Sequence, residues 1–290
     1  MSALTYGVAD FAGGFATKVV RVAVTLFATQ SIGLVIAVGL VSVSNQPMPS
    51  TAALAWAGAA GLSGIVGIAF FYVALARGTM GFVAPVAALI GAALPALVGV
   101  VNGQAATPIL IIGMGVALTS VVLISLPSPT GAGRRADIGR STSLAELVMI
   151  LGAGLGFAGF YLSIDQSSLA GGDPAWQLLL VRVVGLAIAS TVVATLVARG
   201  ARGSLRVPLA VLPLLLVTGI GDIAGNGFFI AARASGPAPV AVVLSSLYPV
   251  ATVLLARAFL HERLHGLRLV GVGFAIAGVV LIAAGQAASV

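Results

Sequence analysis

The chain contains one long hydrophobic stretch twice. A shift of 158 residues, with no gap, places Phe70 on Phe228 and Gly67 on Gly225. The same shift matches further positions across three hydrophobic segments: Ala74 with Ala232, Gly78 with Gly236, Gln104 with Glu262, Gly113 with Gly271, Gly115 with Gly273 and 121–124 with 279–282. One register held over three segments indicates an internal duplication. We therefore expect two halves with the same fold.

Charged residues are too few for this chain to fold in water. They make up 7% of its 290 residues and hydrophobic residues 60%, whereas a soluble domain carries roughly 25% charged residues. The composition predicts an all-α integral membrane protein in a lipid bilayer. Glycines without a strand context suit close helix packing, where small residues let backbones approach. These glycines are Gly61, Gly64, Gly67, Gly152, Gly156, Gly221 and Gly225.

Ten hydrophobic runs approach the length of a membrane-spanning helix, which needs about 20 apolar residues. The runs lie near 2–18, 23–43, 52–76, 79–101, 108–126, 144–164, 174–198, 208–232, 237–259 and 267–286. The longest polar stretch, 127–143, links a first five-helix repeat (1–126) to a second (144–290). Because five is odd, the second repeat enters the membrane upside down. We expect ten transmembrane helices as two inverted five-helix repeats, with a binding site near mid-membrane between them.

Basic residues in the loops predict the orientation of the chain in the membrane. Loops after odd-numbered helices contain Lys18, Arg21, Arg77, Arg134, Arg135, Arg140, Arg199, Arg202, Arg206, Arg263 and Arg268. The loops of the opposite side contain only Arg233. Since Lys and Arg favour cytoplasmic loops, we expect both termini outside. The net charge of +7 is interpreted as this topology signal, and no nucleic-acid partner is expected.

The end of the chain combines Leu247–Pro249 in an apolar helix, a Glu262-Arg263 pair, and a last helix with Gly271 and Gly278. This combination resembles the signature of the EamA family, the ten-helix branch of the drug/metabolite transporter superfamily. The segment Tyr6–Phe11 is similar to the aromatic-glycine start of that family's first helix. The resemblance implies a transporter that exports metabolites or amino acids across a bacterial cytoplasmic membrane.

The sequence departs from the family pattern at two points. Gln104 stands where the first repeat would carry the glutamate. Exporters of this superfamily are thought to keep both termini inside, whereas the loop charges here favour the outside. No cofactor is expected, and a homodimer stays open as the assembly state.

Polar residues deep in the predicted spans are the candidates for substrate binding or coupling. An Arg or Asp at a helix centre costs roughly 2.5–3.5 kcal/mol to insert. Asp222 and Asn226 lie four residues apart in the eighth run and share one face; the alternative is that they bond a neighbouring helix. Asp10 lies roughly 12 Å into the first run. It is expected to titrate, to pair with an arginine or, in a short helix, to lie near the interface.

Arg182 lies at similar depth in the seventh run. Alignment of Gly33 with Gly185 places Gln30 at the equivalent position of the first repeat, so both halves offer a polar group. Arg182 is a candidate to bind a substrate carboxylate through two parallel hydrogen bonds. The alternatives are that it neutralises Asp10 or Asp222, or that its long stem reaches the surface.

Prolines inside the spans are candidate hinges, because each frees a backbone carbonyl and can kink its helix. Tyr248 precedes Pro249 about half-way along the ninth run, which makes Tyr248 a candidate site residue and Pro249 a hinge. Comparable hinges are Pro85, Pro95 and Pro213. Outside the spans, Asp173 before Pro174 predicts a capped helix start.

The segment His261–His265 matches the H-E-x-x-H motif of zinc proteases. That chemistry needs a third ligand and a glutamate as general base. The motif lies at a helix end, however, and the chain contains 2 histidines in total. We therefore expect Glu262 to pair with Arg263 or to cap the helix, and we expect no metal and no catalytic residue. An intramembrane zinc protease is kept as a remote alternative.

The expected function is secondary transport of a small organic metabolite, an amino acid or similar, by alternating access and in the direction of efflux. Coupling to a proton gradient through Asp10 or Asp222 stays open, as does uncoupled facilitation. The nearest alternative is a transporter of sugar phosphates, nucleotide sugars or lipid-linked sugars. Phosphate-bearing substrates would need several basic residues in the cavity, and Arg182 is the only clear basic residue within a predicted span. This argues against that alternative. A non-transporting scaffold is a further hypothesis, which leaves Asp222 and Asn226 unexplained.

Overall fold

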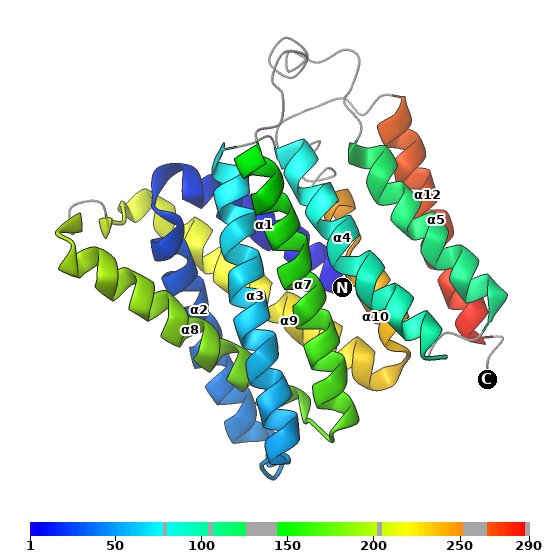
Figure 1. Cartoon of the computed structure of the whole chain (residues 1–290), viewed down its shortest axis with the longest axis horizontal. Helices are drawn as coiled ribbons and strands as arrows, with labels where there is room; N and C mark the ends of the chain where they lie inside the picture. The colour runs from blue at the N-terminus through cyan, green and yellow to red at the C-terminus, as the bar shows by residue number, and fades with distance from the viewer. Residues whose placement is uncertain (78–79, 104–106, 126–143, 202–204, 252–265, 288–290) are drawn as a thin grey trace.

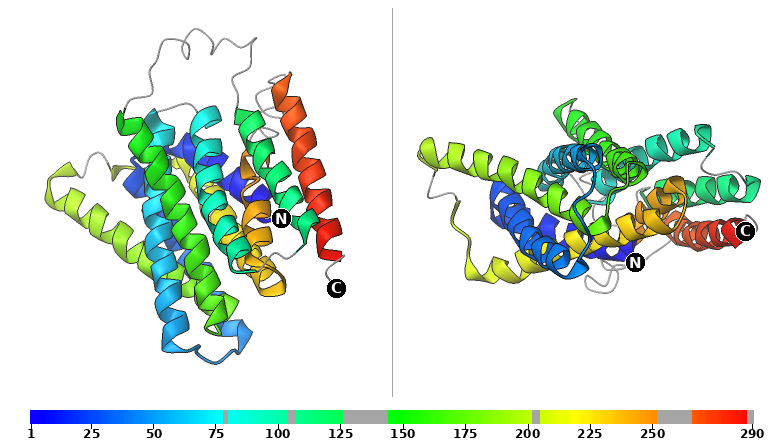
Figure 2. Two further views of the ribbon diagram at one scale, coloured as in Figure 1. Left: turned by 45° about the vertical axis from the view of Figure 1, so that its right-hand side comes forward. Right: turned by 90° about the horizontal axis from the view of Figure 1, so that it is seen from below.

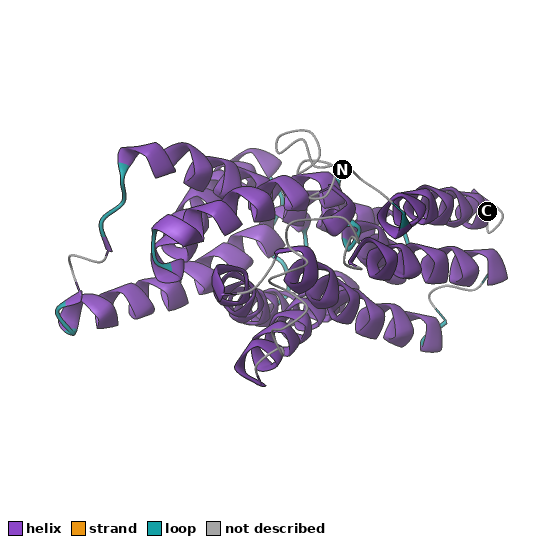
Figure 3. Cartoon of the chain, turned by 90° about the horizontal axis from the view of Figure 1, so that it is seen from above, coloured by secondary structure: helices purple, strands orange, loops and turns teal. Residues whose placement is uncertain are grey.

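The computed structural model describes residues 1–77, 80–103, 107–125, 144–201, 205–251 and 266–287. Within these residues the secondary structure is helical and contains no strand (Figure 3). The helices are α1 (Ser2–Val19), α2 (Val22–Ser44), α3 (Thr51–Arg77), α4 (Met80–Val101), α5 (Pro108–Ser125), α7 (Leu144–Leu169), α8 (Pro174–Ala198), the short η2 (Leu209–Val211), α9 (Leu212–Ser235), α10 (Ala238–Ser245) and α12 (Leu267–Ala287). Each predicted run overlaps one of these helices, but within the run 237–259 the helix α10 ends at Ser245 and a turn follows at Ser246 and Leu247.

Five segments of the described chain are long and apolar enough to cross a membrane. They are Val22–Ser44, Thr51–Ala76, Leu144–Leu169, Pro174–Ala198 and Leu209–Ser235. Shorter apolar helices cover Val86–Val101, Pro108–Leu123, Ala238–Ala251 and Leu269–Ile282. The helical, apolar architecture agrees with the predicted membrane protein.

The start of α8 follows the predicted capping pattern. Asp173 Oδ1 accepts hydrogen bonds from the backbone N–H groups of Ala175, at 2.9 Å, and Trp176, at 3.3 Å. Pro174 occupies the first turn, where its missing N–H costs no helical hydrogen bond. The indole Nε1 of Trp176 donates to the Gln46 carbonyl at 3.3 Å, which ties this end of α8 to the end of α2.

The helices of the two halves interlock rather than form two separate bundles (Figures 1 and 2). The first-half helix α3 packs along α7 and α8, and α4 also packs on α7. In the same way α9 of the second half packs along α1 and α2, and α10 contacts α1. The pairs α2–α8 and α5–α12 each join equivalent helices of the two halves, with α5 and α12 at one edge of the molecule.

Glycines permit the closest helix contacts, as expected from their spacing. A Cβ atom on Gly156 of α7 would lie 2.4 Å from the Cα of Gly67 on α3. A Cβ on Gly225 of α9 would lie 2.5 Å from the Tyr6 ring of α1. These distances leave no space for a side chain at Gly156 or Gly225. The backbones of α3 and α7 therefore meet at Gly67 and Gly156, and the Tyr6 ring of α1 packs directly on the α9 backbone at Gly225.

The prolines affect the helices differently. After Ser245 the chain makes a turn at Ser246 and Leu247, and helical structure resumes at Tyr248, directly before Pro249. By contrast, α4 continues through both Pro85 and Pro95. The expected hinge at Pro213 is wrong, because this residue lies in the first turn of α9, where a proline interrupts nothing.

We predict opposite effects on stability from two Gly→Ala substitutions. Gly156→Ala will lower the unfolding temperature, because the new methyl group overlaps the Gly67 backbone and overpacking costs about 1–3 kcal/mol. Gly115→Ala is the matched control: it lies in α5 with no atom within 4 Å of a Cβ. Alanine there will be neutral or stabilise by up to ~1 kcal/mol. Thermal unfolding in detergent measures both, and equal midpoints would contradict the packing argument.

Candidate functional site

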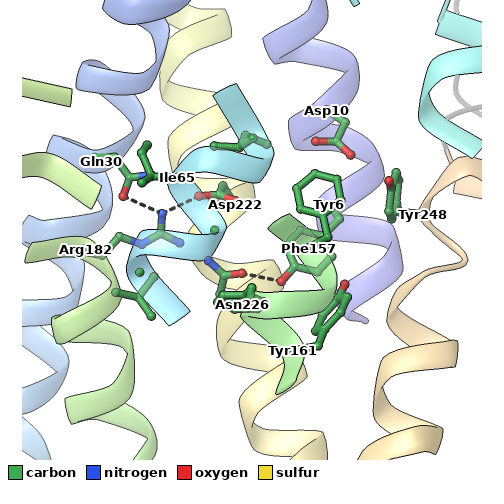
Figure 4. Close-up of a pocket in the computed structure, with 15 residues that line it drawn as sticks. Tyr6, Asp10, Gln30, Ile65, Phe157, Tyr161, Arg182, Asp222, Asn226 and Tyr248 are labelled. Atoms are coloured by element: carbon green, nitrogen blue, oxygen red, sulfur yellow. Dashed lines mark hydrogen bonds and ion pairs between the residues drawn. The ribbon is translucent and has the colours of Figure 1, made fainter. Parts of the chain in front are cut away.

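The interlocked helices form two groups: α3, α4, α7 and α8 make one, and α1, α2, α9 and α10 make the other. A cavity lies between these two groups (Figure 4). Its volume is about 60 Å³, which admits only a few water molecules at roughly 10–15 Å³ each. Its walls come from α1, α2, α3, α7, α8, α9 and the segment after α10. The lining residues are Tyr6, Asp10, Gln30, Gly61, Gly64, Ile65, Ile68, Phe157, Phe160, Tyr161, Val181, Arg182, Asp222, Asn226 and Tyr248.

Arg182 is the central charged residue of the cavity, and its side chain is only 1% exposed. Its Nη1 donates to Asp222 Oδ2 at 2.5 Å and to Gln30 Oε1 at 3.2 Å. Of the alternatives for Arg182, neutralisation of Asp222 is therefore the one that the structure contains, and the side chain does not reach the surface. The Nε and Nη2 atoms are buried and have no hydrogen-bond partner among the described residues.

Two glycines at equivalent positions make the space for this cluster. A Cβ on Gly33 of α2 would lie 2.7 Å from Arg182 Cδ, and a Cβ on Gly185 of α8 would lie 2.6 Å from Gln30 Oε1. Each glycine thus accommodates the polar side chain of the opposite helix. The alignment of Gly33 with Gly185 and of Gln30 with Arg182 corresponds to a reciprocal contact between α2 and α8.

The other side of the cavity is aromatic and carries Asp10 (Figure 4). The Tyr6 hydroxyl donates to Asn226 Oδ1, and the Tyr6 and Tyr248 rings pack edge to face with their centroids 6.4 Å apart. The Tyr248 hydroxyl donates to the Ala84 carbonyl at 3.3 Å. Asp10 lies on α1 near these rings, and no described residue donates a hydrogen bond to its carboxylate. The cavity therefore has an ion-paired side at Arg182 and Asp222 and an aromatic side that carries the carboxyl group of Asp10.

The structure brings all six residues predicted for binding or coupling to one cavity: Asp10, Gln30, Arg182, Asp222, Asn226 and Tyr248. Their role in substrate binding stays a prediction. The candidate hinges Pro95 and Pro249 are not among the lining residues, and the side chain of Pro85 lies outside the described part of the structure. Glu262, with the whole H-E-x-x-H segment, lies outside the described residues, and no group of three or more potential metal ligands occurs within them.

Sequence reasoning missed the apolar wall of the cavity. It consists of residues of α3 and α7, among them Gly64, Ile68 and Phe157. The internal duplication contained a signal for two of them, because a shift of 158 residues places Gly64 on Asp222 and Ile68 on Asn226. Positions equivalent to the polar candidates therefore line the same cavity from the other half.

The structure is an apolar helical bundle around a partly polar internal cavity. Residues 144–284 match the sequence model of the EamA-like transporter family. This segment is an EamA domain, which confirms the resemblance to that family within the drug/metabolite transporter superfamily. Members of this family are membrane transporters, and the apolar helices agree with a multi-pass membrane protein of this type.

Comparison with other known proteins supports the fold. One crystal structure aligns with a TM-score of 0.64 over 97% of this chain and 94% of its own chain, at 19% sequence identity. At that identity the likeness concerns the fold alone. No curated protein sequence matches the chain.

We predict that the Arg182–Asp222 pair matters for stability mainly through mutual neutralisation. Asp222→Leu alone will destabilise the protein by up to about 3–5 kcal/mol, because it leaves a buried guanidinium without its counter-charge. The double variant Arg182→Met with Asp222→Leu will recover most of this loss, since a buried pair can be replaced by apolar side chains at little cost. Thermal unfolding of the three proteins tests this. A double variant less stable than Asp222→Leu would refute the neutralisation argument.

Proposed function

We propose that the protein is a secondary transporter of a small amino-acid-like solute, which it moves by alternating access between two inverted five-helix repeats. The single observation that carries the substrate class is the buried guanidinium of Arg182. Two of its three nitrogen atoms have no hydrogen-bond partner within the described residues, beside a cavity. A carboxylate would satisfy them through the two parallel bonds that arginine forms with this group.

The pattern of helix contacts supports the inverted repeats. An exchange of α3 with α9, α7 with α1, α8 with α2 and α4 with α10 maps the contacts α3–α7, α3–α8, α4–α7 and α3–α4 onto α9–α1, α9–α2, α10–α1 and α10–α9. The pairs α2–α8, α4–α10 and α5–α12 map onto themselves. This is the pattern expected of two copies related by a pseudo-two-fold axis, with the site on the axis. It also supports ten spans, with the shorter helices as the partners of the longer ones.

The size and charge of the cavity favour a small zwitterion over the larger alternatives. Arg182 is the only basic side chain among the described residues that line the cavity, whereas phosphate-bearing sugars would want several. A volume of about 60 Å³ also suits a solute of few atoms. On the opposite side, Asp10 and the tyrosine rings suit an ammonium group, through charge-assisted bonds and cation–π contacts.

Direction, membrane and coupling complete the proposal. We expect efflux across the cytoplasmic membrane, with both termini outside as the loop charges indicate. Among the described carboxylates of the cavity, Asp222 is paired with Arg182, so Asp10 is the stronger candidate for proton coupling. Pro249 and the break before it are proposed as a hinge.

Counterflow of labelled amino acids in proteoliposomes tests the proposal. Arg182→Lys will reduce transport by roughly tenfold to a hundredfold, because lysine keeps the charge but loses the planar donor pair. Arg199→Lys, in the loop after α8, is the control and will transport at the wild-type rate. Wild-type flux in Arg182→Lys would remove the carboxylate assignment. The absence of flux for every amino acid in the wild type, with folded protein, would favour the larger substrates.

The substitution Asp10→Asn distinguishes recognition of the ammonium group at Asp10 from recognition of the carboxylate at Arg182. We expect it to weaken competition by solutes that carry an ammonium group by about tenfold, the cost of one lost charge-assisted bond. Competition by analogues that keep the carboxylate but lack the amine will be unchanged. Inhibition of labelled counterflow by the two kinds of analogue measures the difference. A parallel loss for both would place Asp10 in the folding of α1 instead of in recognition.

A further inference from the structure

A second ion pair joins α7 and α9 outside the cavity. The Nε of Arg233 donates to Asp165 Oδ1, and its Nη1 donates to the Gly236 carbonyl at 3.4 Å. The two side chains are only 15% and 10% exposed. Sequence reasoning used Arg233 only as the single basic residue of its face, and neither residue lines the cavity.

On both α7 and α9, the residue of this ion pair lies on the same helix face as a residue that lines the cavity. On α7, Asp165 follows the cavity residue Tyr161 by four positions, and on α9, Arg233 follows Asn226 by seven, so each shares a helix face with a lining residue. The Tyr161 and Phe229 rings pack between α7 and α9 with centroids 4.6 Å apart. The order from the cavity outward is therefore polar site, aromatic contact, ion pair.

The pair also bridges the two interlocked groups of helices. The helix α7 packs mainly on α3 and α4, whereas α9 packs mainly on α1 and α2. At the opposite end, the equivalent contact between α1 and α3 is close steric packing: a Cβ on Gly13 would lie 2.3 Å from the Tyr72 hydroxyl. The described residues contain no ion pair there. The contacts between the two groups of helices beyond the two ends of the cavity thus differ in chemistry.

We propose that Asp165 and Arg233 form the gate that closes the cavity toward the face where α7 and α9 end. The proposal rests on the proposed alternating access, because opening toward this face must separate α7 from α9. An ion pair suits such a contact. It is strong while water is excluded, and both charges regain hydration when the gap opens, which keeps the opening reversible.

Thiol accessibility tests the gate without any transported solute. The chain has no cysteine, so Ile68→Cys places one thiol in the cavity wall, and Ser235→Cys, exposed at the end of α9, marks the face of the gate. The rate of modification by a membrane-impermeant maleimide is measured from each face of proteoliposomes. Asp165→Asn or Arg233→Gln will accelerate modification of Ile68→Cys from the Ser235 face by about tenfold, as a shifted equilibrium between closed and open states predicts.

The charge-swapped variant, Asp165→Arg with Arg233→Asp, will return the rate toward the original, and Arg233→Lys will give an intermediate rate. Unchanged rates in both neutral variants would overturn the proposal, as would a swapped variant that reacts as fast as the neutral ones. If a neutral variant unfolds, the swapped and lysine variants still decide the question. Because the assay needs no substrate, failed transport with an intact gate response would reject the proposed solute and retain the gate.

Discussion

Close approach of helix backbones at glycine is the constraint on which the rest of this structure depends. In a bilayer, lipid tails are as apolar as leucine, so helices associate through tight packing and polar contacts. Here Gly67 meets Gly156, and Gly225 meets the ring of Tyr6. Through these contacts, α3 of the first half packs on α7 of the second, and α9 of the second half packs on α1 of the first. The cavity forms where the two groups of helices face each other.

The charged side chains of Arg182 and Asp222 inside the apolar bundle are stabilised by pairing with one another. A lone guanidinium in the bundle would be costly, so Arg182 is neutralised by Asp222 and bonded to Gln30. The pairing uses only part of the guanidinium, and the remaining donors lie beside the cavity. The same group therefore contributes to the fold and keeps two nitrogen atoms without a hydrogen-bond partner among the described residues.

The internal duplication relates the helices of the two halves, but it does not preserve the residues that line the cavity. Gly64 and Ile68 of the first half occupy the positions that Asp222 and Asn226 occupy in the second. Small and apolar residues on one side make room, and polar residues on the other make the specific contacts. The same asymmetry holds at the ends of the cavity, with an ion pair at Asp165 and Arg233 and steric packing at Gly13 and Tyr72. Positions that the internal duplication relates thus carry different chemistry on the two sides of the cavity.

The sequence by itself determined the apolar helical character of the chain, the approximate positions of its helices and the shortlist of polar residues. Apolar runs and caps such as Asp173 are local signals, and a charge such as Asp10 or Arg182 in an apolar run is conspicuous without a structure. Only the tertiary structure decided that Arg182 pairs with Asp222 rather than with Asp10, that Ile68 and Phe157 face the polar cluster, and that Asp165 meets Arg233. The physical reason is that partners 40 to 68 positions apart along the chain are chosen by how helices cross and pack, and hydrophobicity records the depth of a residue but not the neighbour it faces.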